Sequence, residues 1–174
     1  MEATAPEHGR EAPAQLPTAF ERLFRAEYPR VVRVAFRVLA DQDEAEDVAQ
    51  DVFLSFYRAH PATADYAAAW LHAAAAHTAL NALRSRGRRT SREAAHAIPE
   101  DAASPDPADA VAVAETRDEV RAILARLSER DASLLALRYA GLSYAEIAGA
   151  IDVRASSVGT LLRRAEDAFR RELA

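Results

Sequence analysis

The chain has 174 residues, of which 50% are hydrophobic, so it can form one ordinary domain or two small ones with buried cores. It contains no cysteine, which excludes disulfide bonds, thiolate metal ligands and cysteine nucleophiles. Its formal net charge of −5 argues against a protein that holds duplex DNA by bulk electrostatic attraction, because such proteins normally carry a strongly basic domain.

Neither an export signal nor a membrane helix is predicted. Residues 1–17 lack the basic start and the apolar core of a secretory signal. No later stretch approaches the roughly 18 continuous apolar residues that a membrane helix requires. We therefore expect a soluble, cytoplasmic protein without membrane insertion.

Two segments, residues 1–17 and 97–112, are rich in proline, alanine and acidic residues and show no apolar period. This composition is typical of a disordered tail and of a flexible acidic linker. Elsewhere the apolar residues recur at helical spacing, and the alternation of half-buried strands is missing. The sequence therefore predicts an all-α fold of two small helical domains, residues 18–96 and 113–174.

Helices are expected at three places in residues 18–96. The first helix begins at a capping box, Thr18–Glu21, and is expected to bend at Pro29. The second opens near residues 43–46, and the third runs from about Ala67 to Arg84. Their apolar stripes predict the core. The expected core residues are Phe20, Leu23, Phe24, Val31, Val32, Ala35, Phe36, Leu39, Val48, Val52, Phe53, Phe56, Leu71, Leu80 and Leu83.

The second domain is predicted to end in a helix-turn-helix. Ser128 is an N-cap candidate for one helix, and Gly141 ends that helix. A capping box at Ser143–Glu146 opens a short helix, and a longer helix follows a turn at residues 152–153. In a helix-turn-helix the second helix normally enters the major groove of DNA.

The outward face of the last helix carries hydroxyl and arginine side chains, because Val158, Leu162, Ala165 and Phe169 fall on its inward face. Hydroxyls near a helix N-terminus suit phosphate oxygens, and arginine can read guanine through two hydrogen bonds. We interpret this face as a DNA contact, with a merely solvated polar face as the alternative. The candidate residues are Ser156, Ser157, Thr160, Arg163 and Arg164.

A run of arginines follows the third predicted helix in an otherwise acidic protein: Arg84, Arg86, Arg88, Arg89 and Arg92. Upstream, that helix carries aromatic and amide groups that can stack on an unstacked base or hydrogen-bond to it. A solvated charge run and a core role for the tryptophan are the alternatives. The candidate DNA-binding residues here are Trp70, His77, Asn81, Arg84, Arg88 and Arg89.

A third candidate surface lies on the second helix, opposite its apolar stripe. It consists of Asp47, Gln50, Asp51 and Leu54, which fall together at helical spacing. This pattern indicates either a hydrated helix face or a face that docks on another protein.

Three segments in register resemble regions 2 and 4 of extracytoplasmic-function sigma factors. They are Asp41–Leu54, then Ala69–Leu71 with His77–Ala79 and Gly87–Arg89, and finally Gly141–Ala148. The resemblance covers nearly everything from Thr18 onward.

The resemblance implies a bacterial transcription initiation factor that directs RNA polymerase core to specific promoters and catalyses no reaction itself. The first domain would dock through Asp47, Gln50, Asp51 and Leu54 on the clamp helices of the largest polymerase subunit and melt the minus-ten element. The second domain would bind the flap of the second-largest subunit and the minus-thirty-five element, with the acidic linker along the RNA exit path. An anti-sigma factor is a further implied partner, and no cofactor or metal is expected.

Two other functions stay open at this point. Where family members commonly carry basic residues, this chain has Ala73, Ala76, Gly159 and Leu161, so a sigma-like adaptor that binds an anti-sigma factor without recognising promoters is one alternative. A stand-alone helix-turn-helix regulator is the other, although neither a dimerisation helix nor a basic balance supports it. An enzyme is least favoured, because the histidines (His60, His72, His77) have no matching acid pair, metal spacing or phosphate loop.

Overall fold

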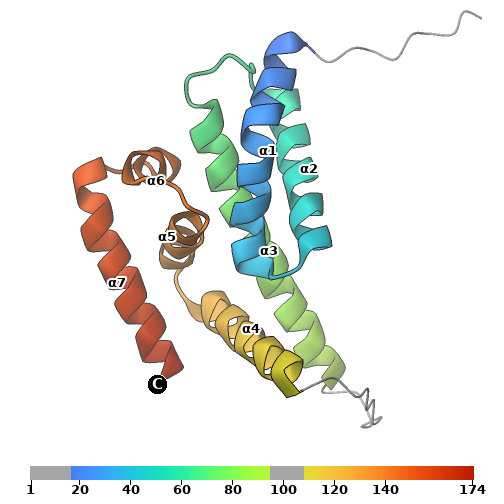
Figure 1. Ribbon diagram of the computed structural model, residues 1–174, viewed down its shortest axis with the longest axis vertical. Coiled ribbons are helices and arrows are strands. Elements are labelled where there is room, and N and C mark those ends of the chain that lie inside the picture. Colours follow the sequence, from blue (N-terminus) through green and yellow to red (C-terminus); the bar gives the residue numbers. More distant parts are fainter. Residues whose placement is uncertain (1–16, 95–107) are drawn as a thin grey trace, which may run out of the picture.

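The computed structural model describes the backbone of residues 17–94 and 108–174, and side chains within 17–89 and 113–174. Most of the predicted tail and linker, and the side chain of Arg92, lie outside these residues. The described chain forms seven helices and no strand, so the all-α prediction is confirmed (Figure 1). The helices are α1 (Thr18–Leu39), α2 (Gln42–Ala59), α3 (Ala67–Ala94), α4 (Ala108–Arg126), α5 (Glu129–Tyr139), α6 (Tyr144–Ile151) and α7 (Ala155–Leu173).

Helices α1, α2 and α3 lie side by side and form what we call the first unit, residues 18–94 (Figure 1). Val34, Phe56, Leu71 and Leu80 are fully buried between them. An aromatic cluster closes one end, where the rings of Phe20, Phe24, Tyr28, Phe53 and Tyr57 contact one another. The apolar stripes therefore pack as the helical periodicity predicts.

The start of α1 differs from the predicted capping box. Pro17 is the N-cap, and no side chain caps this helix. The amide of Glu21, which the hydroxyl of Thr18 was expected to bind, instead donates to the carbonyl of Pro17 at 3.1 Å. This backbone bond makes Thr18 the first residue of the helix. It also occupies the Glu21 amide, so the Thr18 hydroxyl does not cap it.

Helix α3 is longer than predicted and continues through the arginine run to Ala94. Alanine and arginine are strong helix formers, and the single Gly87 is not enough to end the helix. Arg86 also forms an ion pair with Glu44 of α2, which ties the run to the bundle. The arginines therefore extend α3 instead of following it.

Helices α4 to α7 form the second unit, residues 108–174, and α4 begins inside the segment expected to be linker. The N-cap at Ser128 and the capping box at Ser143 are confirmed. Gly141 adopts a positive φ of 92° where α5 ends, and the amide of Leu142 bonds the carbonyl of Leu137 at 3.2 Å. This glycine turn joins α5 to α6. Asp152, with a positive φ of 53°, ends α6, and α7 follows after this second turn, so α6 and α7 form the helix-turn-helix.

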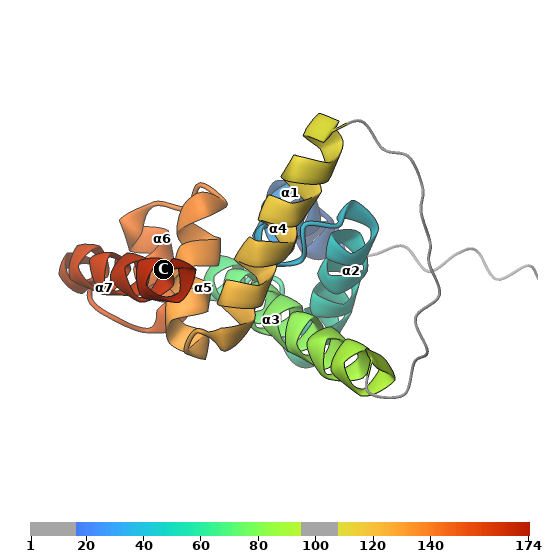
Figure 2. The ribbon, with the colours of Figure 1, turned by 90° about the horizontal axis from the view of Figure 1, so that it is seen from below.

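The two units are in contact over a broad surface. Helix α5 packs against α1 and α3, α6 packs against α3, and α4 crosses α3 (Figure 2). Within residues 17–94 and 108–174, none of the helices is long and apolar enough to cross a membrane. The contact between the units determines which candidate site residues are open.

Candidate nucleic-acid interface

Helix α7 presents the predicted polar face to solvent. Val158, Leu162 and Ala165 are buried against α5 and α6, as expected from their spacing. On the opposite side Ser156, Thr160, Arg163 and Arg164 are exposed, and Ser157 is half-buried. The four N-terminal amides of a helix have no partner within that helix, so the first turn of α7 adds hydrogen-bond donors to this polar face.

A groove runs along this face and includes a residue that the sequence did not indicate. The groove has a volume of about 380 Å³ and is lined by Arg130, Val153, Ser156, Ser157, Thr160, Leu161 and Arg164. Arg130 comes from the first turn of α5, and only the packing of α5 on α7 brings it beside Thr160 and Arg164. Two guanidinium groups and three hydroxyls in one groove suit a phosphate backbone.

An aromatic side chain borders the same helix. A Cβ built on Gly159 would lie 3.5 Å from the ring of Tyr144, so α7 approaches this ring closely. The guanidinium carbon of Arg138 lies 5.7 Å from the centre of the Tyr144 ring, within the range of a cation–π contact. Sequence reasoning also missed Arg138 and Tyr144, because their place beside α7 depends on the α5–α6 turn.

The glutamate of the α6 capping box, Glu146, also accepts a hydrogen bond from an arginine of α1. The Ser143 backbone amide donates to Glu146 Oε2 at 2.8 Å, and the Glu146 amide donates to Ser143 Oγ at 3.3 Å. Arg30 of α1 donates to the other carboxylate oxygen of Glu146. The Ser143 amide and the Arg30 guanidinium together lower the pKa of Glu146 from its ordinary 4.5 to about 2.

This lowered pKa predicts how stability depends on pH. Ionised Glu146 stabilises the fold above pH 4.5, and its contribution is lost as pH falls toward 2. Because the Glu146 side chain is 36% exposed, we discount the full shift for solvent screening and expect about 1 kcal/mol. Urea unfolding of wild type and Glu146→Gln should therefore show a difference in free energy of unfolding that shrinks between pH 5 and pH 2.5.

The matched control is Glu115→Gln, which removes one exposed carboxylate from α4 and leaves the Arg30–Glu146 contact intact. Its difference from wild type should stay constant across the same range. A pH-independent difference for Glu146→Gln would contradict the assigned role of the ionised carboxylate.

The candidate residues on α3 fall into two groups: three are at least partly accessible, and three bond to neighbouring groups. Trp70 is half-buried, with its ring centre 4.8 Å from that of His60 and 5.4 Å from that of Phe56. Arg88 and Arg89 are exposed. Trp70 therefore belongs to the edge of the core while keeping part of its ring accessible.

The other three candidates on α3 are engaged by neighbouring groups. His77 Nδ1 hydrogen-bonds a carboxylate oxygen of Glu129 of α5, and the Asn81 amide nitrogen lies 2.9 Å from His77 Nε2. Arg84 donates to the carbonyl oxygens of Ala125 and Leu127, at 3.3 and 3.0 Å, where α4 ends. These carbonyls have no helical partner, so Arg84 satisfies the end of α4.

The acidic face of α2 is open. Asp47, Gln50, Asp51 and Leu54 are all exposed, and 45% of Leu54 is accessible. Val48, Val52 and Phe56 are buried on the opposite side of the helix. The face therefore offers two carboxylates, an amide and an apolar side chain to a partner.

The buried histidine of α3, His72, belongs to the core of the first unit and pairs with Glu27. His72 is 1% exposed, and its Nε2 lies 2.8 Å from a carboxylate oxygen of Glu27. Burial lowers the pKa of His72, and the Glu27 carboxylate partly opposes that shift. Within the described side chains, no group of histidine, aspartate and glutamate residues could hold a metal ion.

Comparisons with known proteins agree with this geometry. Residues 23–89 match sigma-70 region 2, and residues 117–168 match sigma-70 region 4. The RNA polymerase sigma-H factor of Pseudomonas aeruginosa is 32% identical, with 89% of this chain and 86% of that protein covered. The ECF sigma factor SigK of Mycolicibacterium vanbaalenii is 30% identical, with 87% and 79% covered.

Two further comparisons support less, one because this chain covers only part of the relative and the other because the sequence identity is low. The ECF sigma factor SigE of Mycolicibacterium smegmatis is 29% identical over 90% of this chain, which spans 62% of the length of SigE. The sigma factor RpoE of Bartonella quintana, solved in complex with the anti-sigma factor NepR, has a TM-score of 0.52 at 19% identity. That match covers 90% of this chain and 98% of RpoE, and it supports the fold.

The helix-turn-helix, the basic third helix and the two matched regions define a transcription initiation protein of the sigma-70 type. Because relatives such as SigK are extracytoplasmic-function (ECF) sigma factors, the chain belongs to the ECF sigma factors, which direct RNA polymerase to promoters.

Proposed function

We propose that α7 reads or clamps the minus-thirty-five element while α3 engages the melted minus-ten element. The observation that carries this proposal is the α7 face, where Ser156, Thr160, Arg163 and Arg164 are exposed together above a buried apolar stripe. On α3, the accessible part of Trp70 and the exposed Arg88 and Arg89 would meet the unstacked strand. His77, Asn81 and Arg84 would join them once the second unit moves away.

The acidic α2 face is the proposed docking site for RNA polymerase core. Helix α2 and helix α7 lie on opposite sides of the molecule (Figure 1), so docking and promoter contact would use separate surfaces. We propose the clamp helices of the largest subunit as the partner of Asp47, Gln50, Asp51 and Leu54, and the flap of the second-largest subunit as the partner of the second unit. The units, with boundaries near residues 96 and 113, would then be held apart by the polymerase.

Charge explains why this protein would act only in the holoenzyme. At −5 overall, its acidic groups repel the phosphates that α7 attracts, and few phosphate contacts release few counterions. The free chain should therefore bind promoter duplex weakly. Polymerase would supply the missing affinity, and a protein that acts as a subunit of polymerase would work in the cytoplasm.

Alanine substitution of Arg163 and Arg164, one at a time, tests the α7 assignment. Loss of a two-bond arginine–guanine contact should cost about 1–3 kcal/mol and relax one base position. Loss of a phosphate contact should weaken all sequences alike and lower the salt slope by about one. Transcription by the holoenzyme from a promoter library made from genomic DNA, with start sites mapped, separates these outcomes.

Arg171→Ala is the control, because Arg171 is exposed on the last turn of the same helix. It should leave both promoter choice and the salt slope unchanged. If the Arg163→Ala and Arg164→Ala proteins both transcribe every promoter at the wild-type rate, the assignment of α7 to promoter contact is wrong. Tight, specific binding of one duplex by the isolated chain at physiological salt would do the same.

An anti-sigma factor is a proposed partner, supported by the similar RpoE structure that was solved with one. An adaptor that binds such a factor without recognising promoters is the second candidate function. The absence of a basic side chain at Gly159 and at Leu161 favours it, since α7 then has fewer groups for DNA. Mapped start sites that depend on the chain would exclude the adaptor.

A further inference from the structure

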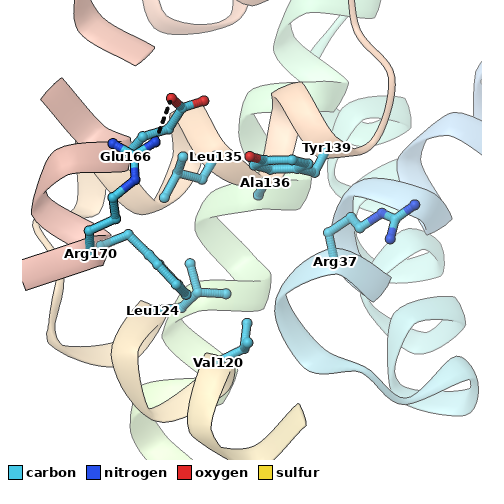
Figure 3. A pocket seen from close by; sticks show the side chains of 9 residues that line it. Arg37, Val120, Leu124, Leu135, Ala136, Tyr139, Glu166 and Arg170 are labelled. Atoms are coloured by element: carbon cyan, nitrogen blue, oxygen red, sulfur yellow. Dashed lines mark ion pairs between the residues drawn. The ribbon is translucent and has the colours of Figure 1, made fainter. Parts of the chain in front are cut away.

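Two neighbouring hollows lie where the end of α1 faces the second unit. The first has a volume of about 340 Å³ and is lined by side chains of α1, α4, α5 and α7 (Figure 3). The second has a volume of about 270 Å³ and lies between the end of α1 and α4. Arg37 and Val120 line both hollows, so a single small molecule can occupy the two together.

The first hollow, which we call the apolar pocket, has walls formed by Val120, Leu124, Leu135 and Phe169. Tyr139 at its edge is 60% exposed, so its ring is open to a ligand. On the side opposite Arg37, Glu166 and Arg170 of α7 pair with each other at 3.7 Å (Figure 3). Pockets that bind small molecules measure about 300–1,000 Å³ and are mostly apolar. This pocket therefore suits an aromatic or branched apolar group.

The second hollow, which we call the basic pocket, is lined by three arginines, Arg37, Arg117 and Arg121. The described residues that line it include no carboxylate. Arg121 pairs with Asp118 at 3.1 Å, and its buried Nε has no hydrogen-bond partner among the described atoms. Arg37 and Arg117 form no ion pair or hydrogen bond with any residue that the structure describes. Two guanidinium charges in this pocket are therefore unpaired.

This surplus of charge indicates the kind of anion that the basic pocket would bind. A phosphate monoester carries a charge of about −1.5 to −2 at pH 7 and offers three acceptor oxygens. A carboxylate would neutralise only one of the two unpaired guanidinium groups. Arginine also binds phosphate through two parallel hydrogen bonds, which are stronger than bonds between neutral groups. The charge therefore favours a phosphate, and the neighbouring apolar pocket favours one that carries an apolar group.

We propose that the two pockets together bind a small organic phosphate, a monoester with an aromatic or branched apolar group. The phosphate lies on Arg37 and Arg117, and the apolar group lies between Val120 and Phe169. None of these residues is among the proposed contacts to DNA or polymerase, so the site goes beyond the proposed function. Because the ligand contacts both units at once, its binding should also raise the unfolding temperature of the chain.

Calorimetric titration of the full-length chain with 1-naphthyl phosphate tests the site. Inorganic phosphate and 1-naphthol, titrated separately, represent the two halves of this probe. We expect 1-naphthyl phosphate to bind at least about 10-fold more tightly than either half, because only the ester uses both pockets. Equal affinity for inorganic phosphate would indicate a plain anion contact, and equal affinity for 1-naphthol a plain apolar one. Either result, or no binding of the ester, overturns the proposal.

Two variants test the two halves of the site. Arg37→Gln should weaken binding of 1-naphthyl phosphate about 10- to 100-fold, through the loss of charge-assisted hydrogen bonds. Phe169→Leu keeps an apolar side chain and should weaken binding of the ester about 2- to 10-fold, through the loss of a ring contact. Phe169→Leu should leave the affinity for inorganic phosphate unchanged. Circular dichroism checks that both variants keep their helix content.

Arg22→Gln is the control, because it removes the same charge from an exposed position of α1 that lines neither pocket. It should bind 1-naphthyl phosphate as tightly as wild type. If Arg22→Gln and Arg37→Gln weaken binding equally, net charge explains the loss and the proposal is wrong. If the ester does not bind and the chain forms dimers that Arg37→Gln disrupts, the pockets are a contact between copies, which also overturns the proposal.

Discussion

Replacing Phe56 by alanine is expected to lower the free energy of unfolding by about 3–5 kcal/mol. The ring is 0% exposed in the first unit and packs against His60 and Trp70, with centres 5.2 and 5.4 Å away. Its removal leaves a cavity that the three long helices cannot collapse to fill. Urea unfolding followed by fluorescence measures the loss, because Trp70 is the only tryptophan in the chain.

The neighbouring Tyr57→Ala provides the control. Tyr57 is 44% exposed, and its ring centre lies 4.8 Å from that of Phe20. Its loss should lower the stability by about 1 kcal/mol, the order of one aromatic pair. If Phe56→Ala were as mild as Tyr57→Ala, the assignment of Phe56 to the rigid centre of the first unit would be wrong.

Reversing the charge at Asp47 and Asp51 is expected to weaken binding of RNA polymerase core about 100-fold. Reversed charges at a docked interface typically leave the partner's cations unpaired and repelled, which costs several kcal/mol. Both side chains are exposed in the middle of α2, so the Asp47→Arg/Asp51→Arg variant should keep its helix content. Fluorescence titration with core polymerase measures affinity, and far-ultraviolet circular dichroism checks the fold.

Glu115→Arg/Glu119→Arg is a closely matched control. These two glutamates are also exposed and also four residues apart on one helix, α4, so the change in net charge is identical. This variant should bind core polymerase close to the wild-type affinity. If both variants bind core polymerase equally weakly, net charge and not a docking face explains the loss. If the α2 variant binds as tightly as wild type, the assignment of the α2 face to docking is wrong.

Much of the local structure was predictable because its causes are local in sequence. The apolar period of α2 placed Asp47 and Asp51 outside and Val52 and Phe56 inside, as observed. Ser143 and Glu146 are separated by one helical turn, and their capping box forms as predicted. The exposed face of α7 follows in the same way from its buried stripe.

Local signals failed where two of them competed. Thr18 has the residue type and spacing of a cap, yet the Pro17 carbonyl bonds the Glu21 amide instead. Arg84 was expected to end α3, but helix propensity and the Arg86–Glu44 ion pair carry the helix onward. In both places a backbone or tertiary partner decided the outcome.

The helices, most of their caps and their polar faces could be predicted from sequence patterns, because each depends on residues within one or two turns. Which of those faces are open depends on how the helices pack. This packing places Arg130 in the α7 groove, Glu146 on Arg30 and Glu129 on His77. These partners come from different helices, and His77 and Glu129 are 52 residues apart in sequence. No periodicity encodes such a distance, so the covering of α3 arises from how the two units pack.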